Sequence, residues 1–522
     1  MRITNTMVFN SSLNNIWRNA RHLNTLVTQI ETTQLIQRPS ENPMIANRAL
    51  RYRTILTETE QFKSNNERGL AWMEVSESAM LNLLVGTPSN RSILQRLHDR
   101  LLHASSTGVN YIEDQKGMIE EMRQFLYQMT RIEMNQSYMG RYVFAGFHTD
   151  EPPVLHADRP NASYVVQQTF NRHDIETTIT FHRPAPYLRP MVFENTHIIK
   201  LPFSNVQFPG TGTLPGTANP DDTINPGAPN PGANIAGVPN FGILCPHGTQ
   251  FEIIHITSDQ RAAYTPGASF TVTDPNPPYE ETVRHIIHHI VDTGELVLSQ
   301  EAKDAFVDGT TIVFQTPEDG LKAGELNPRI YFPSWDLTNN NHHFNTANQA
   351  IQLEVSPNSF VTINSHARNI ITDKFFADMR RLIDFADSLQ LTDPLVIREH
   401  YSQFHADDDL AQAIERFETY EKSAFADMLH DRINNLLQTI ERHISQAQTQ
   451  HTNLGSRMNR MDMIQIRLEE DEVAYTSLLS DAIDTDIAGT IVRKNGAEAA
   501  FQNALFSISR ATQLSLADFI NR

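Results

Sequence analysis

Three closely spaced histidines are the residues whose types and spacing could most readily do chemistry. His285, His288 and His289 fall within residues 284–290, and on a helix two of them would share one side at i and i+4, a common zinc-ligand spacing. They alternate with isoleucines in a β-prone region, and no glutamate completes an H-E-x-x-H pattern. The run therefore favours a surface strand over a metal site, and His342 and His343 add little. We expect no metal ion and no other cofactor.

The acidic residues likewise lack a catalytic or calcium-binding pattern. Asp407, Asp408 and Asp409 lack the alternating oxygen ligands and the glycine of a calcium loop, so a helix start with Asp408 as the N-cap is favoured. No nucleophile elbow, phosphate-binding glycine loop or paired-carboxylate signature stands out. The sequence therefore predicts a protein that is not an enzyme.

Composition excludes several classes of partner. The 522 residues include 42 Lys and Arg against 61 Asp and Glu, a formal net charge of −19. Nucleic-acid binding needs basic residues on phosphates, so it is disfavoured, as is an acidic membrane surface. No apolar run approaches the ~18 residues of a membrane span. Residues 1–10 lack the apolar core of a cleavable secretory signal, and Cys245 alone cannot form an intrachain disulfide.

Apolar periodicity divides the chain into three zones: helical to about Gly140, β-prone and rich in Pro and Gly in the middle, and helical again from about Ile370. The predicted class is α+β. Turn residues at 38–43 end the first helix, and Asn42 followed by Pro43 predicts an N-cap and the start of a long second helix. Heptad-like seams predict further helices through residues 118–139, ended by Gly140, and through residues 454–491. Five short β-prone stretches lie between, at 251–256, 269–273, 310–314, 351–355 and 360–363.

Both chain ends carry an apolar seam and lack a partner helix nearby in sequence, so we expect them to pair in an antiparallel, coiled-coil-like rod with the β-rich region inserted. The expected domains are a terminal helical domain (1–40 and 485–522), a helical rod (41–141 and 370–484) and the insertion (142–369), with a loop at 209–242.

Two paired helices leave apolar surface exposed, which neighbouring copies of the chain could cover in a ring or helical tube. An ordinary intramolecular helical bundle is the alternative. The residues expected at the assembly interface are apolar side chains near the two ends: Ile16, Leu23, Val27, Ile30, Leu479, Ile483, Ile487, Leu505, Ile508, Leu514, Leu516 and Phe519.

Four passages make the chain resemble a known family, the flagellin-like hook-associated proteins of the bacterial flagellum. They are residues 1–4, the turn and helix start at 38–50, the glycine-flanked run at 140–146, and the two ends of the C-terminal limb at 453–468 and 510–519. Each passage alone is weak, but together they are specific. The sequence departs from the family at residues 31–34, where a Ser-Gly-containing turn is usual, and its middle zone is larger than is common.

The resemblance implies a structural adaptor subunit that joins hook to filament, outside the cell. It implies export through the flagellar type III apparatus, a cytoplasmic export chaperone on the C-terminal helix, and neighbouring hook-associated proteins as partners beside other copies of the chain. Filament flagellin is the alternative within the same architecture. A secreted metal-dependent enzyme or glycan binder, carried by the middle zone, is the rival from another class.

Overall fold

The structure is a computed structural model, and it describes residues 5–87, 90–105, 112–182, 192–209, 239, 241–246, 250–256, 270–273, 281–291, 293–347, 349–389 and 410–520. The chain forms two compact units. Unit 1 comprises Met1–Arg68, Leu353–Val361 and Arg460–Arg522, and unit 2 comprises Gly69–Gln352 and Thr362–Asn459. Long helices from both ends of the sequence and a β-rich middle region confirm the predicted fold class. The boundaries of the three expected domains stay predictions.

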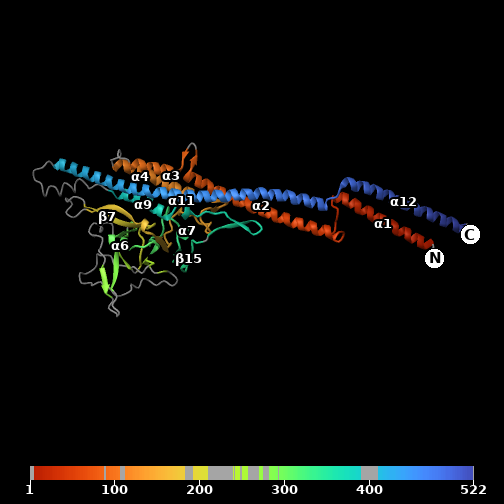
Figure 1. Cartoon of the computed structure of the whole chain (residues 1–522), viewed down its shortest axis with the longest axis horizontal. Coiled ribbons are helices and arrows are strands. Elements are labelled where there is room, and N and C mark those ends of the chain that lie inside the picture. The colour runs from red at the N-terminus through yellow and green to blue at the C-terminus, as the bar shows by residue number, and fades with distance from the viewer. Residues whose placement is uncertain are drawn as a thin grey trace. The chain divides into compact units, whose positions relative to one another are not determined.

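Unit 1 is built from antiparallel helices contributed by opposite ends of the sequence. Helix α1 (Asn5–Thr32) lies beside α12 (Ile487–Ile520), with the two termini at the same end of the pair (Figure 1). The middle of α2 (Pro43–Leu84) is joined to the last third of α11 (Leu410–Ile483): Asn66 Nδ2 donates to the Met461 carbonyl at 3.0 Å, and Lys63 pairs with Glu472 at 2.9 Å. The expected pairing of the chain ends is therefore present.

Backbone hydrogen bonds fasten the α1–α2 connection to the α11–α12 connection. The Leu35 amide donates to the Ile483 carbonyl at 2.6 Å, and the Thr485 amide donates to the Thr33 carbonyl at 2.9 Å. Thr33 has φ 60°, a left-handed conformation that is costly for a β-branched residue. Thr33 lies within residues 31–34, the passage at which the sequence departs from the family that it resembles.

Asp486 ends the long C-terminal seam earlier than the sequence predicted. The expected helix through residue 491 breaks between α11 and α12, where Asp486 Oδ1 accepts from the Gly489 amide at 3.1 Å. A Cβ at Gly489 would lie 2.4 Å from Asp486 Oδ2, so this glycine permits the close approach of the cap. Gly496 lies inside α12 without interrupting it.

The predicted start of the second helix is confirmed. Helix α2 begins at Pro43, the Asn42 carbonyl accepts from the Ala46 amide at 3.0 Å, and Asn42 Oδ1 accepts from the Ile45 amide at 3.3 Å. A short hairpin, β1 (Gly86–Thr87) and β2 (Asn90–Arg91), and helix α3 (Ile93–Ala104) follow.

The predicted helix through residue 139 is wrong at its end. Helix α4 (Ile112–Tyr127) continues as a π-helical turn, η1 (Gln128–Glu133), and the chain then forms the hairpin of β3 (Ser137–Tyr138) and β4 (Arg141–Tyr142). Met139 and Gly140 both have positive φ in the hairpin turn, at 51° and 77°. Gly140 therefore turns a hairpin instead of ending a helix, a choice that helical periodicity alone cannot reveal.

Unit 2 contains two larger sheets. The five-stranded sheet has the order β15 (His342–Phe344), β14 (Ser334–Asp336), β5 (Tyr164–Phe170), β13 (Thr310–Gln315), β8 (Gly242–Leu244). The six-stranded sheet has the order β10 (Phe270–Thr273), β11 (Glu281–Ile290), β12 (Glu295–Leu298), β7 (Val192–Lys200), β6 (Glu176–His182), with β9 (Gln250–Ile256) parallel to β11. Phe203 packs near Phe314 and Phe332, with ring centroids 6.4 and 5.9 Å apart.

Short helices and one hairpin complete the described elements. The helices are η2 (Arg172–Asp174), α6 (Gln300–Ala305), α7 (Pro328–Tyr331), α8 (Ala367–Ile370) and α9 (Asp373–Ser388), and the hairpin is β16 (Gln352–Ser356) with β17 (Ser359–Thr362). All five β-prone stretches of the sequence analysis are strands. Within the described part of the chain, none of the helices has the length and apolar character needed to cross a lipid bilayer.

The histidine-bearing run is a strand, as predicted, but its predicted place on the surface is wrong. Strand β11 lies between β9 and β12, and His288 and His289 are buried. His289 Nδ1 lies 2.9 Å from His255 Nδ1, and the ring packs edge-on against Phe208. Burial lowers the pKa of His289 to about 3, and the nearby His255 makes a smaller contribution in the same direction. Because neighbouring residues of a strand point to opposite faces of its sheet, the burial of both histidines means that both faces of β11 are covered, which the sequence does not show.

We expect Thr33→Gly to stabilise unit 1 by up to about 1 kcal/mol, because glycine removes the ~1–2 kcal/mol cost of the left-handed conformation but adds entropy to the unfolded chain. The measurement is hydrogen exchange in α1 of the full chain. Thr25→Gly is the matched control, and within the helix it should instead destabilise by about 1 kcal/mol. Equal destabilisation by both variants would contradict the strain at Thr33.

We expect β11 to lose stability as the pH falls. The pKa of His289 is lower in the folded protein than in the unfolded chain, so its contribution is complete above about pH 6.5 and declines toward about pH 3. The opening free energy of β11, measured by hydrogen exchange, should fall by about 2 kcal/mol between pH 7 and pH 5. His289→Leu should reduce this dependence, whereas His103→Leu, on an exposed helical position, should leave it unchanged.

Candidate assembly site

The paired terminal helices keep much of their predicted apolar seam partly accessible. Each predicted interface residue with a described side chain is half-buried or exposed: Ile16, Leu23, Val27, Ile30, Leu479, Ile483 and Ile508 are half-buried, and Ile487 and Leu505 are 45% and 44% exposed. Leu514, Leu516 and Phe519 lie in α12, but their side chains fall outside the described ones. One helix covers only one side of another, which explains the incomplete burial. Their role in assembly stays a prediction.

Sequence reasoning missed apolar side chains that point away from the seam. Trp17 on α1 is 59% exposed, and Val492 and Phe506 on α12 are each 71% exposed. Val492 and Phe506 are separated by two heptads, or about four helical turns, so they lie on similar sides of α12. The two-heptad spacing was the signal that could have found them. Leu26, only 3% exposed, was also missed and is buried within unit 1.

Few charges accompany this apolar surface. Helix α1 carries Arg18, Arg21 and Glu31 as its charged residues apart from histidine. On α12 the charged residues are Arg493, Lys494, Glu498, Arg510 and Asp518, and Lys494 pairs with Glu498 at 2.8 Å. Each of the two helices therefore has a formal net charge of +1 apart from histidine, and so small a charge lets identical copies approach without strong repulsion.

The glycine-flanked run at residues 140–146 forms the passage from the helices of unit 2 into its β-rich part. Val143, Phe144 and Ala145 are fully buried, and the Phe144 carbonyl accepts from the Ala367 amide at 3.0 Å. Gly146 has φ 65°, and a Cβ there would lie 2.2 Å from Gln349 Oε1 and 2.8 Å from His366 Cε1. The second glycine is therefore required by both conformation and space.

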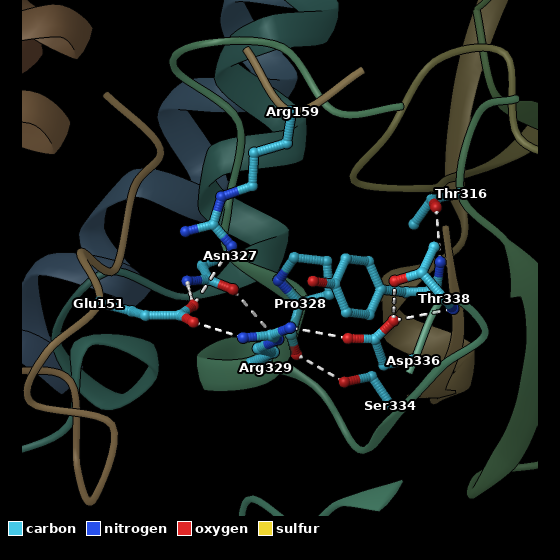
Figure 2. Close-up of polar contacts among 10 residues, drawn as sticks. Glu151, Arg159, Thr316, Asn327, Pro328, Arg329, Ser334, Asp336 and Thr338 are labelled. Carbon is cyan, nitrogen blue, oxygen red and sulfur yellow. Dashed lines mark hydrogen bonds and ion pairs between the residues drawn. The ribbon is translucent and has the colours of Figure 1, made fainter. Parts of the chain in front are cut away.

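Beyond this passage, Arg329 holds the following loop to helix α7 and strand β14 (Figure 2). Its guanidinium pairs with Glu151 on one side and with Asp336 on the other, at 2.7 Å, and lies 4.8 Å from the centre of the Phe344 ring. Glu151 also accepts from Asn327 Nδ2 at 2.9 Å. The cluster anchors the start of the insertion.

The charges of this Arg329 cluster compensate for its burial. Burial raises the pKa of Glu151, but the hydrogen bond from Asn327 and the charge of Arg329 outweigh it and hold the pKa below its usual range. Burial also raises the pKa of Asp336, but hydrogen bonds from Thr338 and Arg329 outweigh it and hold this pKa below its usual range. No sequence signal could have joined Glu151 to Asp336, because the partners come from separate segments.

The described residues supply no metal-binding group of three or more His, Cys, Asp or Glu side chains. His255 and His289 approach each other without a third ligand in such a group, and His342 and His343 lie on β15. Asp407, Asp408 and Asp409 lie outside the described residues. The absence of cofactors stays a prediction.

A comparison with protein-family sequence models matches residues 3–149 to the bacterial flagellin N-terminal helical region. This chain carries a flagellin-type N-terminal region. The match includes helices α1 and α2 with the turn between them, and it ends just after the passage at residues 140–146. The predicted flagellin-like character is therefore confirmed there. No curated protein sequence matches the chain.

Solved structures give distant likenesses to this chain. A protein assigned as a flagellar hook-associated protein from Vibrio parahaemolyticus is 9% identical with a TM-score of 0.36, covering 85% of this chain and 100% of its own. Flagellar hook-associated protein 3 from Legionella pneumophila is 10% identical with a TM-score of 0.28, covering 82% and 97%. FlgL from Xanthomonas campestris is 10% identical with a TM-score of 0.29, covering 83% and 99%. At TM-scores below 0.5, these likenesses carry no conclusion about function.

We expect Gly146→Ala to destabilise unit 2 by more than about 2 kcal/mol, because the new methyl group adds overpacking against Gln349 and His366 to a left-handed backbone. Gly140→Ala is the matched control, since Gly140 has a similar φ of 77° but open space around its Cβ position, and it should cost only about 1–2 kcal/mol. Thermal unfolding of the full chain measures both. Equal losses would show that space at Gly146 is unimportant.

Proposed function

We propose that this chain is a structural, non-enzymatic subunit of the bacterial flagellum that joins hook to filament. The observation that carries the proposal is the antiparallel pair of α1 and α12, which unites the two ends of the sequence yet leaves apolar side chains accessible. The flagellin-type N-terminal region supports the same assignment.

Assembly follows from the surface of the α1–α12 pair. Burying a Val or Phe side chain stabilises a complex by roughly 1.5–3 kcal/mol. A neighbouring copy that covers Val492 and Phe506 would therefore substantially lower the free energy of the assembly. A repeated contact between unlike surfaces of identical copies closes into a ring or continues as a tube. We propose that the ring's neighbours are other hook-associated proteins and that the subunit acts outside the cell.

We propose that the chain leaves the cell through the flagellar type III apparatus. An export chaperone that covers the C-terminal helix in the cytoplasm would prevent early assembly, since the same apolar side chains would otherwise meet there. The net charge of −19 argues against nucleic acid as a partner.

We expect the double variant Val492→Glu with Phe506→Glu to abolish incorporation into the flagellum, because two charges replace the most exposed apolar side chains described on α12. The control is Asn495→Glu with Asn503→Glu, which adds the same charge at exposed polar positions of that helix. Swimming and electron microscopy of isolated hook-basal bodies measure the result, with circular dichroism to verify folding. Normal filaments with a folded Val492/Phe506 variant would overturn the proposed surface.

Filament flagellin is the alternative role, and position along the flagellum separates the two. A specific label should mark a short zone at the tip of the hook if the chain is the junction subunit. A label along the whole filament would instead assign it as flagellin.

A further inference from the structure

Within unit 1, helix α11 carries an apolar stripe on the side away from its buried residues. Met461 and Leu468, one heptad apart, are buried. Met463, Ile466 and Val473 are instead 73%, 59% and 72% exposed. Their heptad-like spacing keeps these three on one side of the helix, and Ile466 lies about 140° around the axis from Met461. Apolar residues scattered singly over a surface are common, but this outer stripe of α11 is a continuous set on one helix face.

The outer stripe of α11 lies in an acidic part of the helix. Residues 462–473 include five acidic residues and one basic residue, Arg467. Glu470 is exposed and takes the heptad position between Ile466 and Val473, so its charge lies within the stripe. Lys63 of the same unit pairs only with Glu472 among the described carboxylates. The stripe therefore combines apolar side chains with a surplus of negative charge.

The start of α2, also in unit 1, has an exposed face of the opposite charge. Residues 43–57 contain three arginines and no acidic residue. Met44 is 77% exposed, and Arg48 and Arg51 are exposed four and seven residues later, on the same side of the helix. Within the described part of the chain, neither of these two arginines forms an ion pair. This basic face of α2 (Met44, Arg48 and Arg51) therefore complements the outer stripe in both charge and spacing.

We infer that the outer stripe of α11 binds the basic face of α2 from a second copy of this chain. In an antiparallel alignment, Met44 meets Val473 and Arg48 meets Glu470, so one apolar contact and one ion pair form in the same register. The two surfaces differ, so the contact repeats from copy to copy and builds a ring or a tube. The inference rests on the proposed function and adds a second contact beside that of the α1–α12 pair.

The contact cannot form within one copy. The rings of Tyr52 and Tyr475 lie 6.5 Å apart, and this fixes the alignment of α2 with α11 in a single chain. Met44 is therefore about ten residues, or about 15 Å, along the helices from Val473 of its own copy. A neighbouring copy displaced by that distance along the helices brings the two residues together.

Disulfide crosslinking in isolated hook-basal bodies tests the contact. The full chain carries Cys245→Ser, so that only introduced thiols react, and Met44→Cys with Val473→Cys places one thiol on each side of the contact. Met44→Cys with Met463→Cys is the matched control, which uses the same stripe about 15 Å away. Oxidation should link copies into dimers and larger multiples for the first pair, and at least about tenfold less for the control, because a disulfide requires Cα atoms within roughly 7 Å.

Charge exchange between copies is an independent measurement. Arg48→Glu and Glu470→Arg should each reduce incorporation into the flagellum about tenfold, because like charges then meet at every contact. Coexpression of the two variants should restore most of the incorporation, since alternating copies present opposite charges to each other. Arg53→Glu, an exposed position on another side of α2, should incorporate normally. Circular dichroism verifies folding.

The outcomes separate this inference from the proposed function. An incorporated Met44/Val473 cysteine pair that links copies no better than its control would overturn the contact and leave the junction role standing. Folded Arg48 and Glu470 variants that incorporate normally would do the same, as would coexpression without restoration. If the cysteine pair does not incorporate, charge exchange decides alone. Absence of the unmodified chain from hook-basal bodies would overturn the proposed function and the contact together.

Discussion

Two backbone hydrogen bonds fasten together two connections of unit 1 that are far apart in the sequence. The amide of Leu35 donates to Ile483, and the amide of Thr485 donates to Thr33, so each connection supplies one donor and one acceptor. Helix formation in water is only marginally favourable, and most helices in proteins are stabilised by packing. Fixing the connections sets α1 beside α12 and converts two amphipathic segments into a single structural element.

The α1–α12 pair depends on strained or closely packed turn residues, and part of its apolar surface stays accessible. Thr33 adopts a left-handed backbone, and Gly489 must lack a side chain so that Asp486 can cap α12. A pair of helices also has too little mutual surface to cover all its apolar residues, which leaves Val492 and Phe506 to solvent. Strained turns and accessible apolar side chains are typical of elements whose function lies in binding further molecules.

Ion pairs join separate segments of unit 2, and the sequence does not predict these pairs. Arg329 joins separate segments through Glu151 and Asp336, and Arg381 does so through Glu176 and Glu295. In each cluster two carboxylates pair with the guanidinium, and one buried N–H, Arg329 Nε or Arg381 Nη2, has no hydrogen-bond partner among the described residues. Buried charges are tolerated only with partners, so both clusters act as anchors between segments of unit 2.

The sequence by itself determined features that depend on neighbours along the chain: the helices at both ends, the Asn42 cap, the strands that β-prone stretches marked, and the flagellin-like passages. Periodicity and turn residues depend only on residues close in the sequence, so they can be recognised before the fold is known. Only tertiary structure decided that His289 is buried, that Gly140 turns a hairpin, and which segments Arg329 and Arg381 join. Those outcomes depend on residues that become neighbours only after folding, and the order of residues along the chain does not show which segments will lie close together.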